Sequence, residues 1–134
     1  AAIWRDTTRV PFIVVSPGVA KAGLRNNQPI SHVDIYPSLC DFAGIPKPGH
    51  LEGRSILPLL KDPSATRDFA FLSYGPQNTA AQSERYRYLR YEDGSEELYD
   101  HQKDPHEWTN LIGDKKYQKQ TKKMRAQVLT FQKK

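Results

Sequence analysis

The chain of 134 residues has a formal net charge of +5, and its hydrophobic content of 37% is low for a domain that must build its own core. The single cysteine excludes an intrachain disulfide and a cysteine metal cluster, and no apolar run is long enough to span a bilayer. Residues 114–134 carry eight Lys or Arg and one acid, whereas the remaining 113 residues carry twelve basic and fourteen acidic side chains. The basic tail therefore indicates a solvated helix face rather than a nucleic-acid or membrane patch.

The first element is an apolar run, Phe12 to Val15, inside "RVPFIVVSPG". A β-branched run without alternation is typical of a strand buried on both faces of an α/β sheet. No second strand of this kind follows in the sequence. Because the chain also begins "AAIWRD" without Met, we expect the partner strands to lie in residues upstream.

Two helices are predicted next, in "SHVDIYPSLCDFAGIP" and "EGRSILPLLKDP". Ser31 and Asp34 are suited to cap the first helix, and Gly44 is suited to end it. Its apolar positions recur at three- and four-residue steps and predict one buried face: Val33, Tyr36, Leu39, Cys40 and Ala43. The second helix is short and ends at Asp62-Pro63.

From Asp68 the pattern changes to that of an antiparallel sheet. Strands are predicted at 69–74, 85–91 and 96–100, with "EDGS" at 92–95 as a hairpin turn and "NTAAQ" before the second strand as a loop. Residues 115–132 predict a helix that packs on this sheet. Its apolar seam is Tyr117, Thr121, Met124, Val128 and Phe131.

The segment "YDHQKDPHEW" raises the question of a metal site, because five ligating side chains crowd together: Asp100, His101, Asp104, His106 and Glu107. Asp104 is suited to be an N-cap, Pro105 to be the first helical residue and Glu107 to complete a capping box. The two histidines lie five positions apart, which does not place them on one helix face. We therefore predict a capped helix, "PHEWTNLI", and no metal site.

Isolated polar residues elsewhere give no catalytic set. The sequence lacks the nucleophile-elbow, zincin, P-loop and dinucleotide-binding motifs. Single histidines, His32 and His50, are more often structural than catalytic, and a capping role explains Asp34 better than a role as a base. "RYRYLRY" is suited either to an ordinary amphipathic strand, which we favour, or to a nucleic-acid surface.

Three stretches, in this order and spacing, resemble the C-terminal part of type I sulfatases of the alkaline-phosphatase-like superfamily. They are "TRVPFIVVSPG", then "HVDIYPSLCDFAGIP" with "LEGRSILPLL", and then "RYRYLRYEDGSEELYDHQKDPHEWTNL". The resemblance covers about residues 3 to 112 and is nearest to the bacterial iduronate-2-sulfatase-like or choline-sulfatase-like branch. It supports a structural role for "ELYDHQKDPHE".

The resemblance implies a mixed α/β fold, α+β in its C-terminal part. Residues 1–62 are then the tail of the catalytic α/β domain, with its last strand and helix. Residues 63–134 are a small subdomain, in which an antiparallel sheet carries a packed C-terminal helix.

The resemblance also implies the chemistry of a parent enzyme, in which a cysteine in C-x-P-S-R becomes formylglycine and a calcium ion stabilises the sulfuryl group. Cys40 lies in "CDFAG" and does not match that motif, so we expect no catalytic residue and no metal ligand in this chain. In the loop before "SERYRY", Thr79 and Gln82 replace the family's usual His and Arg. Gln77 and Asn78 are our candidates for the substrate rim.

We therefore expect the C-terminal piece of a sulfatase, a sulfuric ester hydrolase, that is inactive alone and needs an upstream catalytic domain. The parent's substrate is a sulfated small molecule or glycan, and its location is periplasmic or secreted by the resemblance only. Alternatives are a phosphodiesterase or phosphonate hydrolase of the same superfamily, or a stand-alone basic module that binds anionic polymers.

Overall fold

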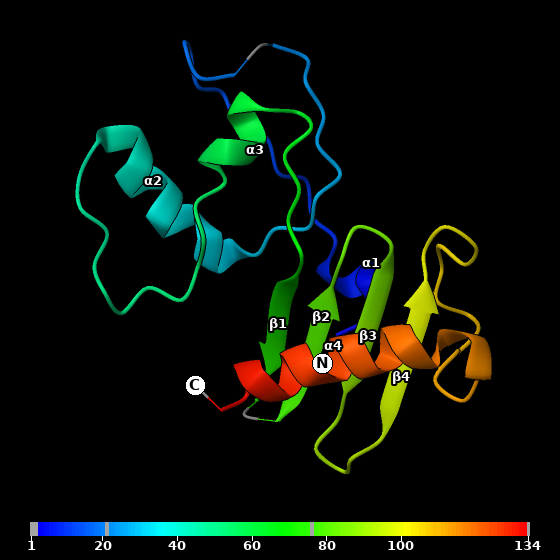
Figure 1. Cartoon of the computed structure of the whole chain (residues 1–134). Coiled ribbons are helices and arrows are strands. Elements are labelled where there is room, and N and C mark those ends of the chain that lie inside the picture. Colours follow the sequence, from blue (N-terminus) through cyan, green and yellow to red (C-terminus); the bar gives the residue numbers. More distant parts are fainter. Residues whose placement is uncertain (1–2, 21, 76, 134) are drawn as a thin grey trace. The chain divides into compact units, whose positions relative to one another are not determined.

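The computed structural model describes residues 3–20, 22–75 and 77–133 and divides the chain into two compact units (Figure 1). One unit combines Ala1–Val10 with Phe69–Lys134, and the other is Pro11–Asp68. The assignment of 1–62 to a catalytic domain and of 63–134 to a subdomain stays a prediction, because contacts within this chain do not identify the domains of a larger protein.

The first unit is built on an antiparallel sheet in which the strands follow each other in chain order. The strands are β1 Ala70–Tyr74, β2 Asn78–Gln82, β3 Tyr86–Arg90 and β4 Glu96–Asp100. Three of them were predicted, but the prediction of a loop at "NTAAQ" was wrong, since this segment is β2, one of the two inner strands. Ala80 and Ala81 are fully buried there, and their small side chains let both faces of the sheet be covered closely. Pairing and burial thus override the low strand propensity of Asn and Ala.

The predicted hairpin between β3 and β4 is confirmed. The backbone N–H of Tyr91 donates to the carbonyl of Ser95 at 3.0 Å, and Gly94 has a φ of 84°. Glycine adopts this left-handed conformation without steric cost, so the turn depends on it. The Asp93 carboxylate accepts the Ser95 N–H at 2.8 Å and completes the turn.

The alternation of "RYRYLRY" is also confirmed, and it gives the sheet two buried faces. Tyr88, Leu98 and Ala81 belong to the face that carries the C-terminal helix, where they contact Met124 and Val128. On the opposite face, one further apolar cluster is formed by Ile3, Ala80, Leu89 and Tyr99.

The C-terminal helix lies across one face of the sheet, as predicted (Figure 1). It consists of a short turn, η2 Lys115–Tyr117, and α4 Gln118–Phe131. The middle of the predicted seam is buried, namely Thr121, Met124 and Val128. A mixed α/β fold with an antiparallel sheet and a packed C-terminal helix is therefore confirmed.

The second unit contains the two predicted helices. They are η1 His32–Asp34, which continues into α2 Ile35–Ala43, and α3 Leu57–Lys61. Gly44 ends α2 in the left-handed conformation, with a φ of 65°, as the sequence indicated. Gly53 is required for a different reason: a Cβ atom there would lie 2.0 Å from the carbonyl oxygen of Val33.

The predicted strand at Phe12 to Val15 is not formed. These residues have no regular structure, and Ile13 and Val15 are each 86% exposed. A strand needs hydrogen-bonding neighbours, and no described residue of this chain pairs with this segment. The apolar run whose sequence predicts a buried strand is thus largely exposed.

The apolar face predicted for the first helix is only partly buried. Cys40 is buried, but Val33, Tyr36 and Leu39 are between 52% and 57% exposed. The helix instead buries Pro37 and Ser38 within its own unit. Periodicity thus identified an apolar face correctly but did not show that this chain leaves most of it uncovered.

The N-terminal segment forms a four-residue helix, α1 Arg5–Thr8, which the sequence did not predict. Within the described part of the chain, none of the helices combines the length and the apolar character needed to cross a lipid bilayer.

Candidate functional site

The segment "YDHQKDPHEW" forms no metal centre in the structure. Over the described residues, no three His, Cys, Asp or Glu side chains gather in a way that could hold a metal ion. His106 turns instead toward Trp108, with the two rings stacked at 5.1 Å between centroids. A structural interpretation of the segment is therefore the one its geometry supports.

The structural role differs from the predicted capped helix, because residues 105–112 form turns and no helix. The Asp104 carboxylate does accept backbone N–H groups, as predicted, including that of Thr109 at 2.7 Å. Glu107, however, has a φ of 59°, a left-handed backbone that a growing helix cannot contain. The carboxylate of Glu107 is also engaged elsewhere, so the predicted capping box is wrong.

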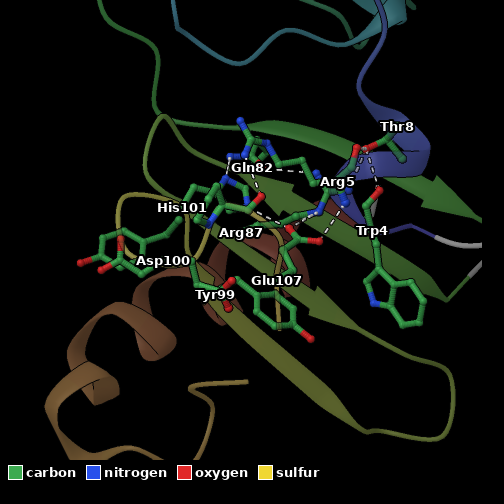
Figure 2. A network of polar contacts seen from close by, with 12 residues as sticks. Trp4, Arg5, Thr8, Gln82, Arg87, Tyr99, Asp100, His101 and Glu107 are labelled. Atoms are coloured by element: carbon green, nitrogen blue, oxygen red, sulfur yellow. Dashed lines mark hydrogen bonds and ion pairs between the residues drawn. The ribbon is translucent and has the colours of Figure 1, made fainter. Parts of the chain in front are cut away.

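Glu107 lies at the centre of a buried polar network on the sheet face opposite α4 (Figure 2). One carboxylate oxygen is 2.8 Å from Nε2 of His101, and the other accepts the backbone N–H of Arg5 at 2.9 Å. The guanidinium Nε of Arg87 approaches the same carboxylate to 3.6 Å. The side chains of Glu107 and Arg87 are each 5% exposed, so a charged pair is enclosed by the protein.

Arg87 holds the N-terminal segment against the sheet. Its guanidinium donates to the backbone carbonyl of Ile3, to the hydroxyl of Thr8 at 3.1 Å and to the amide oxygen of Gln82 at 3.1 Å. The amide nitrogen of Gln82 is 3.3 Å from Nδ1 of His101, so the network closes on itself. Alternation placed Arg87 beside Leu89 on one face, but nothing in the sequence indicated the segment that covers it.

The electrostatics of the network keep both ions charged. Burial raises the pKa of Glu107, but hydrogen bonds from His101 and the Arg5 backbone, with the charge of Arg87, outweigh burial and hold this pKa below its ordinary value. Burial lowers the pKa of Arg87, and the charge of Glu107 opposes that shift. A guanidinium still remains protonated at neutral pH. The network therefore joins the N-terminal segment to the sheet through a buried pair of opposite charges.

Two of the three arginines of "RYRYLRY", Arg85 and Arg87, are engaged in ion pairs. Arg85 makes a bidentate contact with the buried Asp100 carboxylate, at 2.8 and 2.6 Å, and this contact holds the pKa of Asp100 below its usual range. With Arg87 buried as well, neither arginine is presented for phosphate. The strand is thus an ordinary buried strand with paired charges.

Asp34 is likewise a structural residue. Its carboxylate accepts the backbone N–H groups of Ser31 at 2.7 Å and of Arg54 at 2.8 Å, and it pairs with the guanidinium of Arg67 at 2.7 Å. Burial raises the pKa of Asp34, but the Arg67 contact and the two backbone donors outweigh burial and lower it. The predicted capping role is confirmed, and the same carboxylate also ties together distant parts of the second unit.

The two candidates for the substrate rim, Gln77 and Asn78, lie where β2 begins. The Gln77 carbonyl accepts a hydrogen bond from the amide of Gln132 at 2.8 Å, and the Asn78 side-chain oxygen accepts the Glu92 N–H at 3.2 Å. Neither contact concerns a substrate, so their role at a rim stays a prediction.

Asn78 also lines a hollow of about 570 Å³ at this end of the sheet. The other walls come from the N-terminal segment, the end of β1 and the β3–β4 hairpin. They include Trp4, Tyr74, Tyr91, Asp93 and Glu97. Sequence analysis did not single out these residues, because the hollow assembles from four separate segments.

Comparison with known proteins gives a consistent result. The family described as N-sulphoglucosamine sulphohydrolase, C-terminal, matches residues 2–134. A sulfatase of Formosa agariphila is 31% identical over 93% of this chain and 25% of its own length. A Delta 4,5-hexuronate-2-O-sulfatase of Bacteroides thetaiotaomicron is 33% identical over 88% of this chain and 27% of its own length.

Solved structures agree with the sequence relatives. A protein solved in complex with its substrate D-glucosamine-2-N,6-O-disulfate superposes with a TM-score of 0.67 at 27% identity, over 87% of this chain and 26% of the other. A phosphonate monoester hydrolase of Agrobacterium radiobacter superposes with a TM-score of 0.56 at 27% identity. The match covers 72% of this chain and 23% of the hydrolase.

The chain thus spans about a quarter of the length of the relatives it matches. The family match extends over the whole described fold, including the sheet, α4 and the buried Glu107 network. This chain belongs to the N-sulphoglucosamine sulphohydrolase C-terminal family of the sulfatases.

Proposed function

We propose that this chain is the C-terminal region of a sulfatase that hydrolyses sulfate esters, and that it supports the active site without supplying the nucleophile. The observation that carries the proposal is the family match over residues 2–134, together with relatives named as sulfatases. The position of Cys40 supports the proposal that this chain does not supply the nucleophile. Cys40 is the only cysteine of the sequence, and it is buried in α2 within "CDFAG".

The substrate class we propose for the parent enzyme is a sulfated glycan. The support is the printed activity of one relative, a hexuronate-2-O-sulfatase, and the glucosamine disulfate bound by one structural neighbour. Specificity of the iduronate-2-sulfatase type is a finer proposal that rests on the sequence resemblance alone.

Calcium and formylglycine are proposed for the parent enzyme, together with a periplasmic or secreted location. The described residues of this chain do not group three ligating side chains, so they do not fit a calcium site and no catalytic step is derived through the metal. When bound in such an enzyme, a calcium ion would stabilise negative charge on the transferred sulfuryl group.

We further propose an upstream catalytic domain as the partner of this chain. The support is apolar surface that a larger protein would cover: Ile13 and Val15 in the unpaired segment, and Val33, Tyr36 and Leu39 on α2. Apolar patches of this kind mark interaction surfaces in soluble proteins. Gln77 and Asn78 remain our proposed contribution to the substrate rim.

The first experiment is to sequence the coding region upstream of Ala1 and to assay the resulting longer protein beside this chain. We expect a C-x-P-S-R motif upstream, turnover of 4-methylumbelliferyl sulfate by the longer protein and none by this chain alone. Robust turnover by the chain alone would contradict the proposed supporting role. A Thr or Ser nucleophile together with the ligands of a two-metal site upstream would contradict the sulfatase proposal.

A second candidate function is phosphonate or phosphate diester hydrolysis, which the phosphonate monoester hydrolase neighbour favours. Because the two classes share the fold, they are separated by substrate. The longer protein would then hydrolyse a phenylphosphonate monoester faster than a sulfate ester. The basic-module alternative loses its support at the sheet, because Arg85 and Arg87 are ion-paired.

A further inference from the structure

The hollow beside Asn78 has the volume of a ligand site. Its volume of about 570 Å³ falls within the range of small-molecule sites, about 300–1,000 Å³. It lies where β1 ends and β2 begins, next to the β3–β4 hairpin, and Trp4 of the N-terminal segment forms one of its walls. Trp4 and Tyr74 are 49% and 53% exposed, so their rings remain accessible.

One carboxylate holds two of the aromatic walls, Trp4 and Tyr91, together with the neighbouring Tyr99. Oε2 of Glu97 accepts the indole N–H of Trp4 at 3.0 Å, the hydroxyl of Tyr91 at 3.2 Å and the hydroxyl of Tyr99 at 3.0 Å. Burial raises the pKa of Tyr91 to about 12, so this phenol stays a neutral donor. Because the polar ends of Trp4 and Tyr91 are fixed, these two rings are already ordered before a ligand arrives, which removes part of the entropic cost of binding.

The polar groups of the hollow are mostly acceptors. Oε1 of Glu97 has no donor among the residues that the structure describes, and Asp93 uses one oxygen, Oδ1, for the N–H and hydroxyl of Ser95. The amide of Asn78 adds donors, since the bond described for this side chain uses its oxygen. A ligand that fits must therefore bring several hydroxyl groups that donate as well as accept.

The charge of the hollow excludes an anionic ligand. Glu92, Asp93 and Glu97 line it, whereas no Lys or Arg appears among its described lining residues. A sulfate or carboxylate group would meet repulsion from three carboxylates with no compensating cation. Aromatic surface combined with acceptors and amide donors instead suits the C–H face and hydroxyl groups of an uncharged sugar ring.

We propose that this hollow is a binding subsite for an unsulfated, neutral sugar residue, held against Trp4 and Tyr74 and hydrogen-bonded by Glu97 and Asn78. The assignment to a sugar rests on the proposed glycan-directed function. The binding chemistry of the hollow is independent of sulfate hydrolysis, so its test does not require turnover.

The test uses the whole chain with Trp108→Phe, which leaves Trp4 as the only tryptophan to report by fluorescence. Lactose and N,N′-diacetylchitobiose are the neutral probes. Lactose with one sulfate ester is the anionic probe, and tetramethylammonium is the cationic probe. We expect saturable changes with millimolar dissociation constants for at least one neutral disaccharide, and binding at least fivefold weaker for sulfated lactose than for lactose.

Two substitutions and a matched control sharpen the test. Tyr74→Ala removes an exposed wall, and we expect it to weaken neutral-sugar binding at least fivefold. Tyr36→Ala is the matched control, because Tyr36 on α2 is 52% exposed and Tyr74 is 53% exposed. It should change the dissociation constant for the neutral sugar by less than twofold. Asp93→Asn keeps the side-chain oxygen that accepts hydrogen bonds in the turn but removes a negative charge. It should therefore reduce the difference in affinity between lactose and sulfated lactose.

Three outcomes would overturn the proposal. They are no saturable response to either neutral disaccharide, saturation by tetramethylammonium without saturation by the sugars, and equal binding by the Tyr74→Ala and Tyr36→Ala variants. If the sugars bind while the longer protein lacks sulfatase activity, the proposed function fails and the subsite stands. If instead the longer protein is an active sulfatase but the sugars do not bind, the proposed function stands and the proposed subsite is wrong.

Discussion

Glu107 shows how much one side chain contributes in this protein. A residue that sequence reasoning placed in a capping box instead bonds His101, the backbone of Arg5 and, by charge, Arg87. It therefore connects three segments that are far apart in the sequence. Removing its charge would leave the buried Arg87 guanidinium without its carboxylate.

We expect Glu107→Gln to lower the free energy of unfolding by about 1.5–3 kcal/mol, because hydrogen bonds to a charged group are lost in a buried site. Urea denaturation at neutral pH measures this change. Glu92→Gln, at an exposed glutamate, is the control and should change the stability by less than about 0.5 kcal/mol. Equal effects of the two substitutions would contradict the role assigned to Glu107.

The same carboxylate predicts an acid dependence. The pKa of Glu107 is lower in the folded chain than its ordinary value of 4.5, so the folded state binds fewer protons than the unfolded state. Its stabilising contribution is complete above pH 4.5 and is lost as the pH falls through the folded pKa. We expect a steeper loss of stability below pH 4.5 in the wild type than in Glu107→Gln, measured by urea midpoints from pH 6 to 3. Parallel curves would contradict this assignment.

Gly53 is the residue whose side chain must be absent. A Cβ atom would lie 2.0 Å from the carbonyl oxygen of Val33, so the backbone must shift. We expect Gly53→Ala to destabilise the second unit by about 1–3 kcal/mol, the usual cost of forced overpacking. Gly49→Ala is the matched control, because its Cβ would meet no atom within 4 Å. Thermal unfolding followed by circular dichroism compares the two variants.

Among the elements, helix α4 depends on a narrow buried seam. Met124 has no exposed surface, whereas its near neighbour Leu129 is 37% exposed. We expect Met124→Ala to cost about 2–5 kcal/mol, the range for truncating a buried Met. Leu129→Ala should cost much less in the same urea denaturation experiment. Similar losses for both would indicate that α4 does not pack on the sheet as described.

Elements with strong local signals were predicted from the sequence, and elements that depend on distant partners were not. The seam of α4 and the hairpin at 92–95 each carry their pattern within a few residues, so periodicity and turn chemistry were sufficient. Strand β2 is rich in alanine and becomes a strand only because β1 and β3 flank it. The apolar run Phe12 to Val15 shows the opposite case. Its sequence is typical of a strand, but no described strand of this chain pairs with it.

In the Glu107 network, too, local features were predicted from the sequence and distant partners were not. Within the 99–108 segment, the role of Asp104 as an acceptor of backbone N–H groups was predicted correctly, because this chemistry is local, whereas the predicted helix and its capping box were wrong. Their partners were missed, since Arg87 and Arg5 lie far away in the sequence. Likewise Asn78 was singled out from its loop position, whereas the hollow that it lines requires Trp4 and the β3–β4 hairpin.

At the scale of the whole molecule, exposed apolar side chains set its solution behaviour. Ile13 and Val15 are 86% exposed within a segment that forms no strand, and exposed apolar surface of this kind favours association with another chain. We expect this chain to self-associate as its concentration rises, and the double substitution Ile13→Lys with Val15→Lys to reduce that association. Light scattering across a concentration series measures the effect. Trp108→Lys, at a single exposed aromatic residue, is the control and should change it little.

The contact between Arg87 and the carbonyl of Ile3 joins positions that are 84 residues apart. Closing so long a loop is entropically costly before the contact is made, so the N-terminal segment should dock after the sheet has formed. During synthesis this segment leaves the ribosome before the second unit and before the strand that receives it. It must therefore wait for β3, and it completes the fold of a sheet that is made after it.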